Sequence, residues 1–483
     1  MLAIGKYYAR RNKTAEDYNL GGRRMSPFAV GLSLFATLTS SVSYLAVPGE
    51  FVKNGPMIQA GLVAYPLIAV AVGWGLIPFI MRQQVTSAYA MLEQPFGVSV
   101  RLLGSTIFLT ARLVWMATVV YATSYAVLSP LLGLGPRATI VAAIALCTIT
   151  IIYTAEGGLR AVVVTDATQS LIMLAGAVFA IAVVSLDLGG VSAWWPHEWQ
   201  AQWAEPKFEL DSSTRITFLG AAISTFAYWI AICGSDQMAI QRWLSTRDAS
   251  SARRSLFTML GTDALVQSLL GIVGLAVVGY FTAHPELFPG SANLVEGADK
   301  LFPLFLVSGL PMGLAGLIVA AVLAAAMSSL SSGMNSSCVV ITDDFIGRFR
   351  SSPLPDAARV RLSRFISVGI GVVVILLSLL VSQIQGNLID LCFRVVNLLV
   401  APLFVLFFLA MFVRWATAFG AWVAALVSIA TAVFISFSES FGAGPLSITW
   451  IIPGSFFAGA VAGGLASLLP IGGRAADHDS RPN

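Results

Sequence analysis

Hydroxyl side chains gather at the middle of an otherwise apolar stretch, residues 27–53, near the start of this 483-residue chain. The run consists of Thr37, Thr39, Ser40, Ser41 and Ser43, and Pro48 and Gly49 follow it. Hard cations prefer oxygen ligands, and a helix broken at this run would also free backbone carbonyl oxygens. The run therefore indicates an ion site. The alternative is that each hydroxyl bonds to the carbonyl one turn earlier.

A second group of hydroxyls lies in the apolar stretch 312–342, within the letters AAAMSSLSSGMNSS at 324–337. With Ser328 as the reference direction, the other three hydroxyls of SSLSS lie at about 100°, −60° and 40° on a helix. They belong to Ser329, Ser331 and Ser332. Four hydroxyls thus cover one side of the helix, where they could ligate a cation. Close helix packing through small residues is the alternative.

Charged residues inside apolar stretches are costly in a membrane and tend to mark function. Asp166, in VVVTDATQS, could join a cation site, pair with a base, or lie near water at a helix end. Asp390 and Arg394 are spaced to pair on one helix face. Arg112 has no obvious local partner, and an arginine that lines a cavity could hold an anionic solute. Asp263 is the remaining charge of this kind.

Patterns that would indicate an enzyme are absent from the sequence. It contains no HExxH or GxSxG, and its three histidines lie far apart. The four cysteines are also widely separated, so no metal site is indicated. We therefore expect neither catalysis nor a cofactor.

Composition identifies the elements that must position these residues. Hydrophobic residues make up 57% of the chain and charged residues 11%, against about 25% in soluble domains. The mean hydropathy is +0.82. These values exclude a soluble enzyme and a nucleic-acid-binding domain, and they predict an all-α protein in a lipid bilayer. No obligate protein partner is indicated.

Twelve stretches are long enough to span a membrane. They cover roughly 27–53, 58–81, 102–132, 137–154, 162–186, 216–235, 256–282, 312–342, 364–382, 387–413, 416–437 and 447–469. We expect four regions: an N-terminal segment 1–26, a ten-helix core 27–413, two additional helices in 414–469, and a disordered tail 470–483.

Basic residues predict the orientation. If the N-terminus is cytoplasmic, 21 of the 28 lysines and arginines fall on the cytoplasmic side, Arg242 among them, and 5 fall outside. The other two, Arg112 and Arg394, lie inside the membrane. Because basic residues favour the cytoplasmic side, both termini are predicted there. This asymmetry also explains the formal net charge of +4 without an anionic partner. The predicted location is the inner or plasma membrane.

Five stretches together resemble the sodium:solute symporter family, which includes symporters for sugars, sialic acid, proline, iodide and monocarboxylates. They are residues 17–50, TSAYAMLEQPFG at 86–97, YTAEGGLRAVVVTDATQSLIML at 153–174, DQMAIQRWLSTRD at 236–248 and AAAMSSLSSGMNSS at 324–337. The resemblance implies a LeuT-like fold, in which two inverted repeats of five helices surround a broken first helix. It also implies symport of sodium with a solute.

The resemblance further implies two sodium sites. Helix 1 carbonyls and helix 8 hydroxyls would form the main site, from Ala36, Thr39, Ala325, Ser328 and Ser329. Some members build a second site on the helix 5 aspartate, which here would combine Asp166, Ser328, Ser331 and Ser332. Coupling to protons through Asp166 is the alternative.

The family's solute-binding positions fall here on Leu38, Ser40, Ser43, Leu62, Trp115 and Phe393. Several donors and acceptors of the sugar and sialic acid members are lost, and each buried sugar hydroxyl without a partner costs about 1–3 kcal/mol. We therefore expect a small organic anion such as a monocarboxylate, with Arg112 or Arg394 as its counter-charge. A sugar or sialic acid is the alternative.

Overall fold

A computed structural model describes residues 1–483 except 84, 289–293, 311, 353, 382–387 and 471–483. Within these described residues the chain forms helices and connecting loops, without strands. The α-helices are α1 Leu2–Ala9, α2 Ala15–Leu20, α3 Pro27–Leu38, α4 Ser41–Asn54, α5 Tyr65–Val70, α6 Ile77–Arg82, α7 Ala90–Phe96, α8 Val98–Tyr121, α9 Ser129–Leu132, α10 Pro136–Asp187, α11 Phe218–Ser235, α12 Gln237–Leu244, α13 Ala249–Ala283, α14 Ala298–Ser308, α15 Met312–Val340, α16 Asp356–Val381, α17 Leu388–Phe412, α18 Ala418–Ser436 and α19 Ile451–Ala466.

Nine described helices are long and apolar enough to cross a membrane, or ten when α3 and α4 count as one bent span. Twelve were expected, and part of the difference lies in α10, which joins two expected helices. A straight helix of its 52 residues would be about 78 Å long, against about 30 Å of bilayer hydrocarbon. Gly158 interrupts α10 with a φ of 58° and a ψ of −162°. A Cβ there would lie 2.7 Å from the Tyr18 carbonyl oxygen, so the position requires glycine.

The expected break in the first spanning helix is present, between α3 and α4. Thr39 and Ser40 are extended, with ψ values of 116° and 175°, and the two helices meet at 67°. Ser40 caps α4 by accepting a hydrogen bond from the Val42 amide at 3.2 Å. A serine that caps a new helix competes with continuation of the old one, which explains why the hydroxyl run breaks this span.

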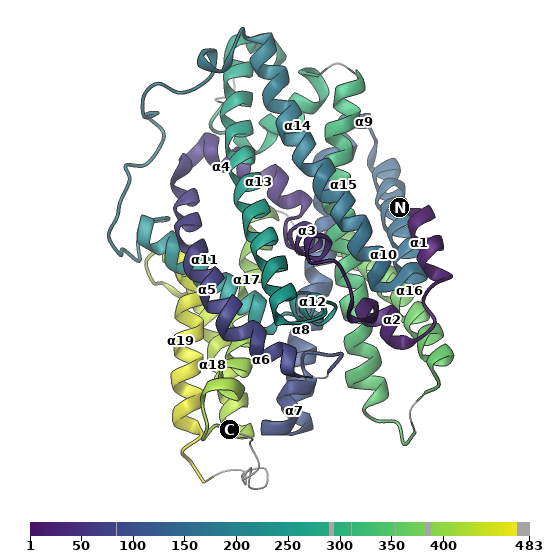
Figure 1. The fold of residues 1–483 in the computed structure, drawn as a ribbon. Helices are drawn as coiled ribbons and strands as arrows, with labels where there is room; N and C mark the ends of the chain where they lie inside the picture. The colour runs from purple at the N-terminus through teal and green to yellow at the C-terminus, as the bar shows by residue number, and fades with distance from the viewer. Residues whose placement is uncertain (84, 289–293, 311, 353, 382–387, 471–483) are drawn as a thin grey trace.

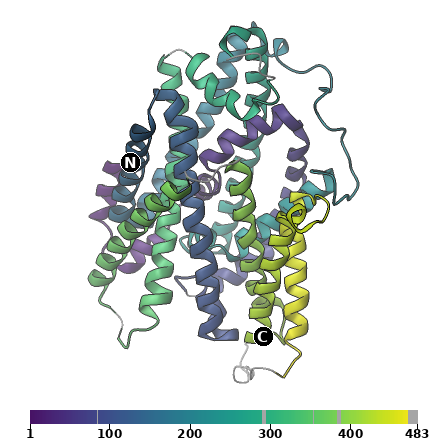
Figure 2. The same cartoon turned by 180° about the vertical axis from the view of Figure 1, so that it is seen from behind.

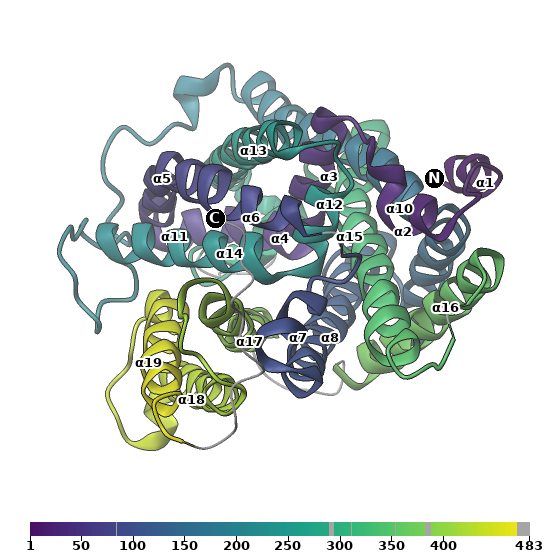
Figure 3. The same ribbon diagram turned by 60° about the horizontal axis from the view of Figure 1, so that its bottom comes forward.

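The interrupted helix lies at the centre of the bundle. α3 packs against α10, α13 and α15, and α4 packs against α13 and α14 (Figure 1). All residues of α3 from Val30 to Thr37 are buried. α17, α18 and α19 pack on one another at one side, away from α1 and α16 (Figure 3). Seen from behind, the yellow C-terminal helices stand at the edge opposite the N-terminus (Figure 2).

Candidate functional site

The end of α3 meets the hydroxyl-bearing face of α15. The last carbonyls of a helix have no partner within it. Here the Ser328 hydroxyl donates to the Ala36 carbonyl oxygen at 2.6 Å and the Ser329 hydroxyl to that of Thr37 at 3.2 Å. Ser328 also donates to the Ala325 carbonyl at 3.0 Å. Oxygen atoms of two helices thus converge in a buried place, which is the chemistry that a hard cation requires.

Four of the five predicted main-site residues therefore lie at this junction: Ala36, Ala325, Ser328 and Ser329. Thr39 lies in the break itself and directs its hydroxyl elsewhere, to the Asp263 carboxylate at 3.2 Å. Asp263 also accepts a hydrogen bond from the Tyr65 hydroxyl. Sequence reasoning identified Asp263 as an intramembrane charge but gave it no place in the site.

Asp166 lies on another side of α3, fully buried. Two of the residues predicted for the second site, Ser331 and Ser332, donate to its carboxylate at 3.4 Å and 3.0 Å. The fourth predicted member, Ser328, bonds instead to the α3 carbonyl. Two α3 hydroxyls join the carboxylate, Ser33 at 2.7 Å and Thr37 at 3.4 Å. Ser33 lies one helical turn before Thr37, and this spacing was the signal that could have identified it.

Arg242 completes the Asp166 network, a role that the charge count did not anticipate. That count put Arg242 on the cytoplasmic side, but its side chain is completely buried. The guanidinium lies 3.0 Å from the Asp166 carboxylate, donates to Ser33 at 2.9 Å and also bonds to Ser332. The helix α12 that carries it is short and holds all eight of its residues buried. A length threshold of about 20 apolar residues cannot detect such an element.

Arg112, predicted as a possible counter-charge for an anionic solute, already has an acidic partner. It forms an ion pair with Asp236, and its guanidinium lies 5.5 Å from the centre of the Phe108 ring. Asp236 also caps α12 by accepting from the Met238 amide at 2.8 Å. These partners lie 124 positions apart, so helical spacing could not reveal the pair. The side chains of Arg394 and Phe393 lie outside the described residues.

Three of the remaining predicted solute residues lie at the break itself. Leu38 ends α3, Ser40 caps α4, and Ser43 lies in the first turn of α4, half-buried. Trp115 of α8 packs against the apolar cluster that contains Val42. The last one, Leu62, is half-buried in the 3₁₀ segment Pro56–Ala64.

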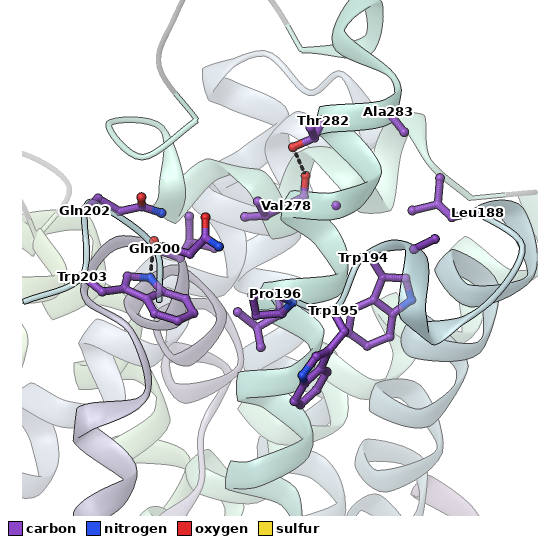
Figure 4. Close-up of a pocket in the computed structure, with 14 residues that line it drawn as sticks. Leu188, Trp194, Trp195, Pro196, Gln200, Gln202, Trp203, Val278, Thr282 and Ala283 are labelled. Atoms are coloured by element: carbon purple, nitrogen blue, oxygen red, sulfur yellow. Dashed lines mark hydrogen bonds between the residues drawn. The ribbon is translucent and has the colours of Figure 1, made fainter. Parts of the chain in front are cut away.

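A separate cavity of about 480 Å³ lies between the loop after α10 and the ends of α4 and α13 (Figure 4). Trp194, Trp195 and Trp203 line it, and the Trp203 indole donates to the Val52 carbonyl at 3.3 Å. Tryptophans in such loops usually sit at a membrane interface. None of the predicted sodium or solute residues lines this cavity.

Comparison with known proteins identifies the family of this chain. The model of the sodium:solute symporter family matches residues 18–428. Similar proteins include the sodium/sialic acid symporter of Aliivibrio fischeri, 30% identical over 90% of this chain and 85% of that protein. The one from Proteus mirabilis is 31% identical, over 89% and 86%. The human sodium-coupled monocarboxylate transporter 1 is 29% identical, over 90% of this chain and 70% of that protein.

Solved structures agree with this placement. A sodium-coupled sialic acid symporter, solved in a substrate-bound outward-open state, superposes with a TM-score of 0.82 at 27% identity. The superposition covers 97% of this chain and 95% of the symporter chain. The nucleobase-cation symporter Mhp1 has a TM-score of 0.60 at 16% identity, covers 93% and 92%, and supports the fold alone. These neighbours are transporters rather than enzymes, and the chain is a multi-pass membrane protein that belongs to the sodium:solute symporter family.

Proposed function

We propose that this protein is a sodium-coupled symporter that imports a small organic solute by alternating access. The observation that carries the proposal is the junction of α3 and α15, where the Ser328 hydroxyl lies 2.6 Å from the freed Ala36 carbonyl. A sodium ion bound there would replace weak contacts between the two helices with ligand bonds to both. As a transported ion, sodium is a substrate of the protein.

Coupling follows from differential binding to two states. A ligand shifts an equilibrium only by binding one state better than the other. Sodium that ligates both α3 and α15 binds best when the two helices are close, so its binding orders the break at Thr39 and Ser40. The solute residues Leu38, Ser40 and Ser43 border that break, and the ordered break binds solute more tightly. By linkage, solute then tightens sodium binding by the same factor.

A second sodium at Asp166, with Ser331 and Ser332, is supported by the convergence of oxygen atoms there. Arg242 already balances the charge of the carboxylate, so this ion would share Asp166 with the guanidinium or displace it. Proton coupling through Asp166 is the competing proposal. Measuring sodium dependence at fixed pH separates the two.

For the solute we propose a small organic carboxylate, in line with the apolar character of Leu38, Leu62 and Trp115. A monocarboxylate transporter and two sialic acid symporters are among the similar proteins, so sialic acid or a sugar is the alternative. We place the protein in the plasma or inner membrane with both termini cytoplasmic, on the distribution of basic residues.

The test is the thermal stability of the purified protein in sodium chloride and in potassium chloride at equal ionic strength. Pyruvate, propionate, galactose, sialic acid and proline are then added singly. We expect a sodium-specific rise in Tm that one ligand class enlarges, because a ligand that binds only the folded state stabilises it.

Two serine variants make this test specific. Ser329→Ala removes a hydroxyl at the α3 junction, so the sodium-specific rise should fall. Ser336→Ala is the matched control, because this hydroxyl donates within α15 to the Ser332 carbonyl at 2.6 Å. An equal sodium effect in Ser329→Ala, Ser336→Ala and the parent protein would contradict the main-site assignment.

A further inference from the structure

Four aspartates of the described chain are buried, and three of them face an arginine. Asp166 pairs with Arg242, Asp236 with Arg112, and Asp344 with Arg101. Asp263 is also buried, with 3% of its surface exposed, and in the described part of the chain it has no basic partner. A buried carboxylate without a counter-charge is costly. An ionised Asp263 would therefore have no counter-charge among the side chains that the structure describes.

The partners of Asp263 supply dipoles but no charge. Thr39 and Tyr65 donate hydroxyl hydrogen bonds to the two carboxylate oxygens of Asp263. These bonds hold the carboxylate in one position. A carboxylate held in a fixed position, without charge compensation, has the properties of a receptor for a cationic group.

Asp263 also borders the proposed solute site. Thr39 lies between Leu38 and Ser40, and Tyr65 follows Leu62 by three residues, close to one helical turn. Through these two neighbours the carboxylate is connected to solute positions on both α3 and the 3₁₀ segment.

Aromatic rings beside the carboxylate favour an organic cation over a metal ion. The ring of Tyr65 packs edge-on to that of Trp229, with centroids 6.2 Å apart, and Trp229 packs on Tyr228 at 5.6 Å. Aromatic faces attract ammonium groups, whereas sodium needs several oxygen ligands.

The break also provides a site that favours negative charge, at the start of α4. Ser40 begins α4, and the N-terminus of this 14-residue helix carries partial positive charge that favours a carboxylate. We propose that the solute is a zwitterion whose protonated or quaternary nitrogen binds Asp263, while its carboxylate faces the start of α4. This inference rests on the proposed symport function and refines its solute.

Pairs of solutes that differ only in one nitrogen test the proposal. Glycine betaine has 3,3-dimethylbutyrate as its carbon analogue, and proline has cyclopentanecarboxylate. Each is titrated into the purified protein in sodium chloride, with Tm as the readout. For any that bind, uptake is measured into proteoliposomes with sodium outside and potassium inside. We expect the nitrogen member of at least one pair to bind, and to bind at least about tenfold more tightly than its carbon analogue.

Variants separate this claim from the sodium claim. Asp263→Asn should reduce the preference for nitrogen at least about tenfold while it keeps the sodium-specific rise in Tm. Asp263→Glu should retain part of that preference, and Glu156→Gln, at an exposed acid, should retain all of it. Elution as a single species in size-exclusion chromatography checks folding.

The proposal is overturned if the carbon analogues bind as tightly as their nitrogen partners or more tightly. It is also overturned if no solute of either pair binds. Loss of the sodium-specific rise in Asp263→Asn also overturns it, because Asp263 would then belong to an ion site. A failure of the symport proposal itself would give a different result, because the parent protein would then show no sodium-specific rise in Tm.

Discussion

The two buried aspartates that bond to α3 and its break are held in contrasting ways. Asp166 accepts from Ser33, Thr37 and Ser332 and faces a fully buried guanidinium. Asp263 accepts from hydroxyls as well, but no basic side chain of the described chain faces it. Asp166 therefore has its counter-charge within the protein, whereas an ionised Asp263 has none among the described residues, and we propose that a bound solute supplies it.

This difference separates two tasks. The Asp166 network fastens α3 to α10, α12 and α15 through charge that the protein already contains. The Asp263 network links the break to α5 and α13, and in our proposal its carboxylate also binds the nitrogen of the solute. Because only Asp166 is paired with a buried arginine, substitutions at the two aspartates should change the free energy of unfolding by different amounts.

The largest expected effect belongs to Asp166→Asn. It leaves the Arg242 charge buried without its partner, which costs about 3–5 kcal/mol for pairs of this kind. Asp263→Asn strands no cation and should cost less than about 3 kcal/mol. Thermal unfolding of the purified variants in potassium chloride measures both.

The double variant Asp166→Asn with Arg242→Gln is the control for this interpretation. Removing both charges should restore part of the stability that Asp166→Asn loses, because no buried ion then remains unpaired. Equal losses at Asp166 and Asp263, without rescue in the double variant, would show that the two sites do not differ in charge balance.

An intermediate effect is expected for Tyr65→Phe, which removes a hydroxyl donor from Asp263. Hydrogen bonds to charged groups contribute about 1.5–3 kcal/mol, against about 0.5–1.5 kcal/mol for neutral ones. Tyr153→Phe is the matched comparison, because its hydroxyl donates to the neutral Met327 carbonyl at 3.2 Å. If both tyrosine variants lose the same stability, the carboxylate near Tyr65 carries no charge.

The smallest effect concerns an exposed pair that links the ends of α10 and α13. His284 lies 2.8 Å from Asp187, and this hydrogen bond raises the pKa of His284 above its usual range. A raised pKa gives stability that is complete below the unfolded value of about 6.5 and lost as pH rises through the folded value. Between pH 6 and pH 8, Tm should therefore fall slightly more in the parent than in His284→Asn. An identical pH dependence of Tm in the parent and in His284→Asn would show that this pair does not contribute to stability.

Much of the fold was predictable, because apolar runs and local capping determine it. The hydroxyl run at Thr37–Ser43 predicted the break, because serine is a favourable helix cap and Ser40 caps α4. The sequence also indicated the Ser328 and Ser329 face of α15. Helical spacing alone predicted which side of the helix these hydroxyls occupy.

The charge partners were not predictable in the same way. Arg242 reaches Asp166 across 76 positions and Arg112 reaches Asp236 across 124. Such pairs depend on how helices distant in sequence pack, and helical spacing carries no information about that. The significance of Asp263 has the same origin, because the lack of a basic partner among the described residues becomes visible only once the helices are packed.

The central claim is that sodium holds the broken helix against α15. Hydrogen–deuterium exchange of residues 36–42, measured in sodium and in potassium chloride, tests this most directly. The account predicts slower exchange at the break in sodium, and loss of that difference in Ser329→Ala but not in Ser336→Ala. Exchange at the break that is the same in both salts, or a sodium effect that persists in Ser329→Ala, would contradict it.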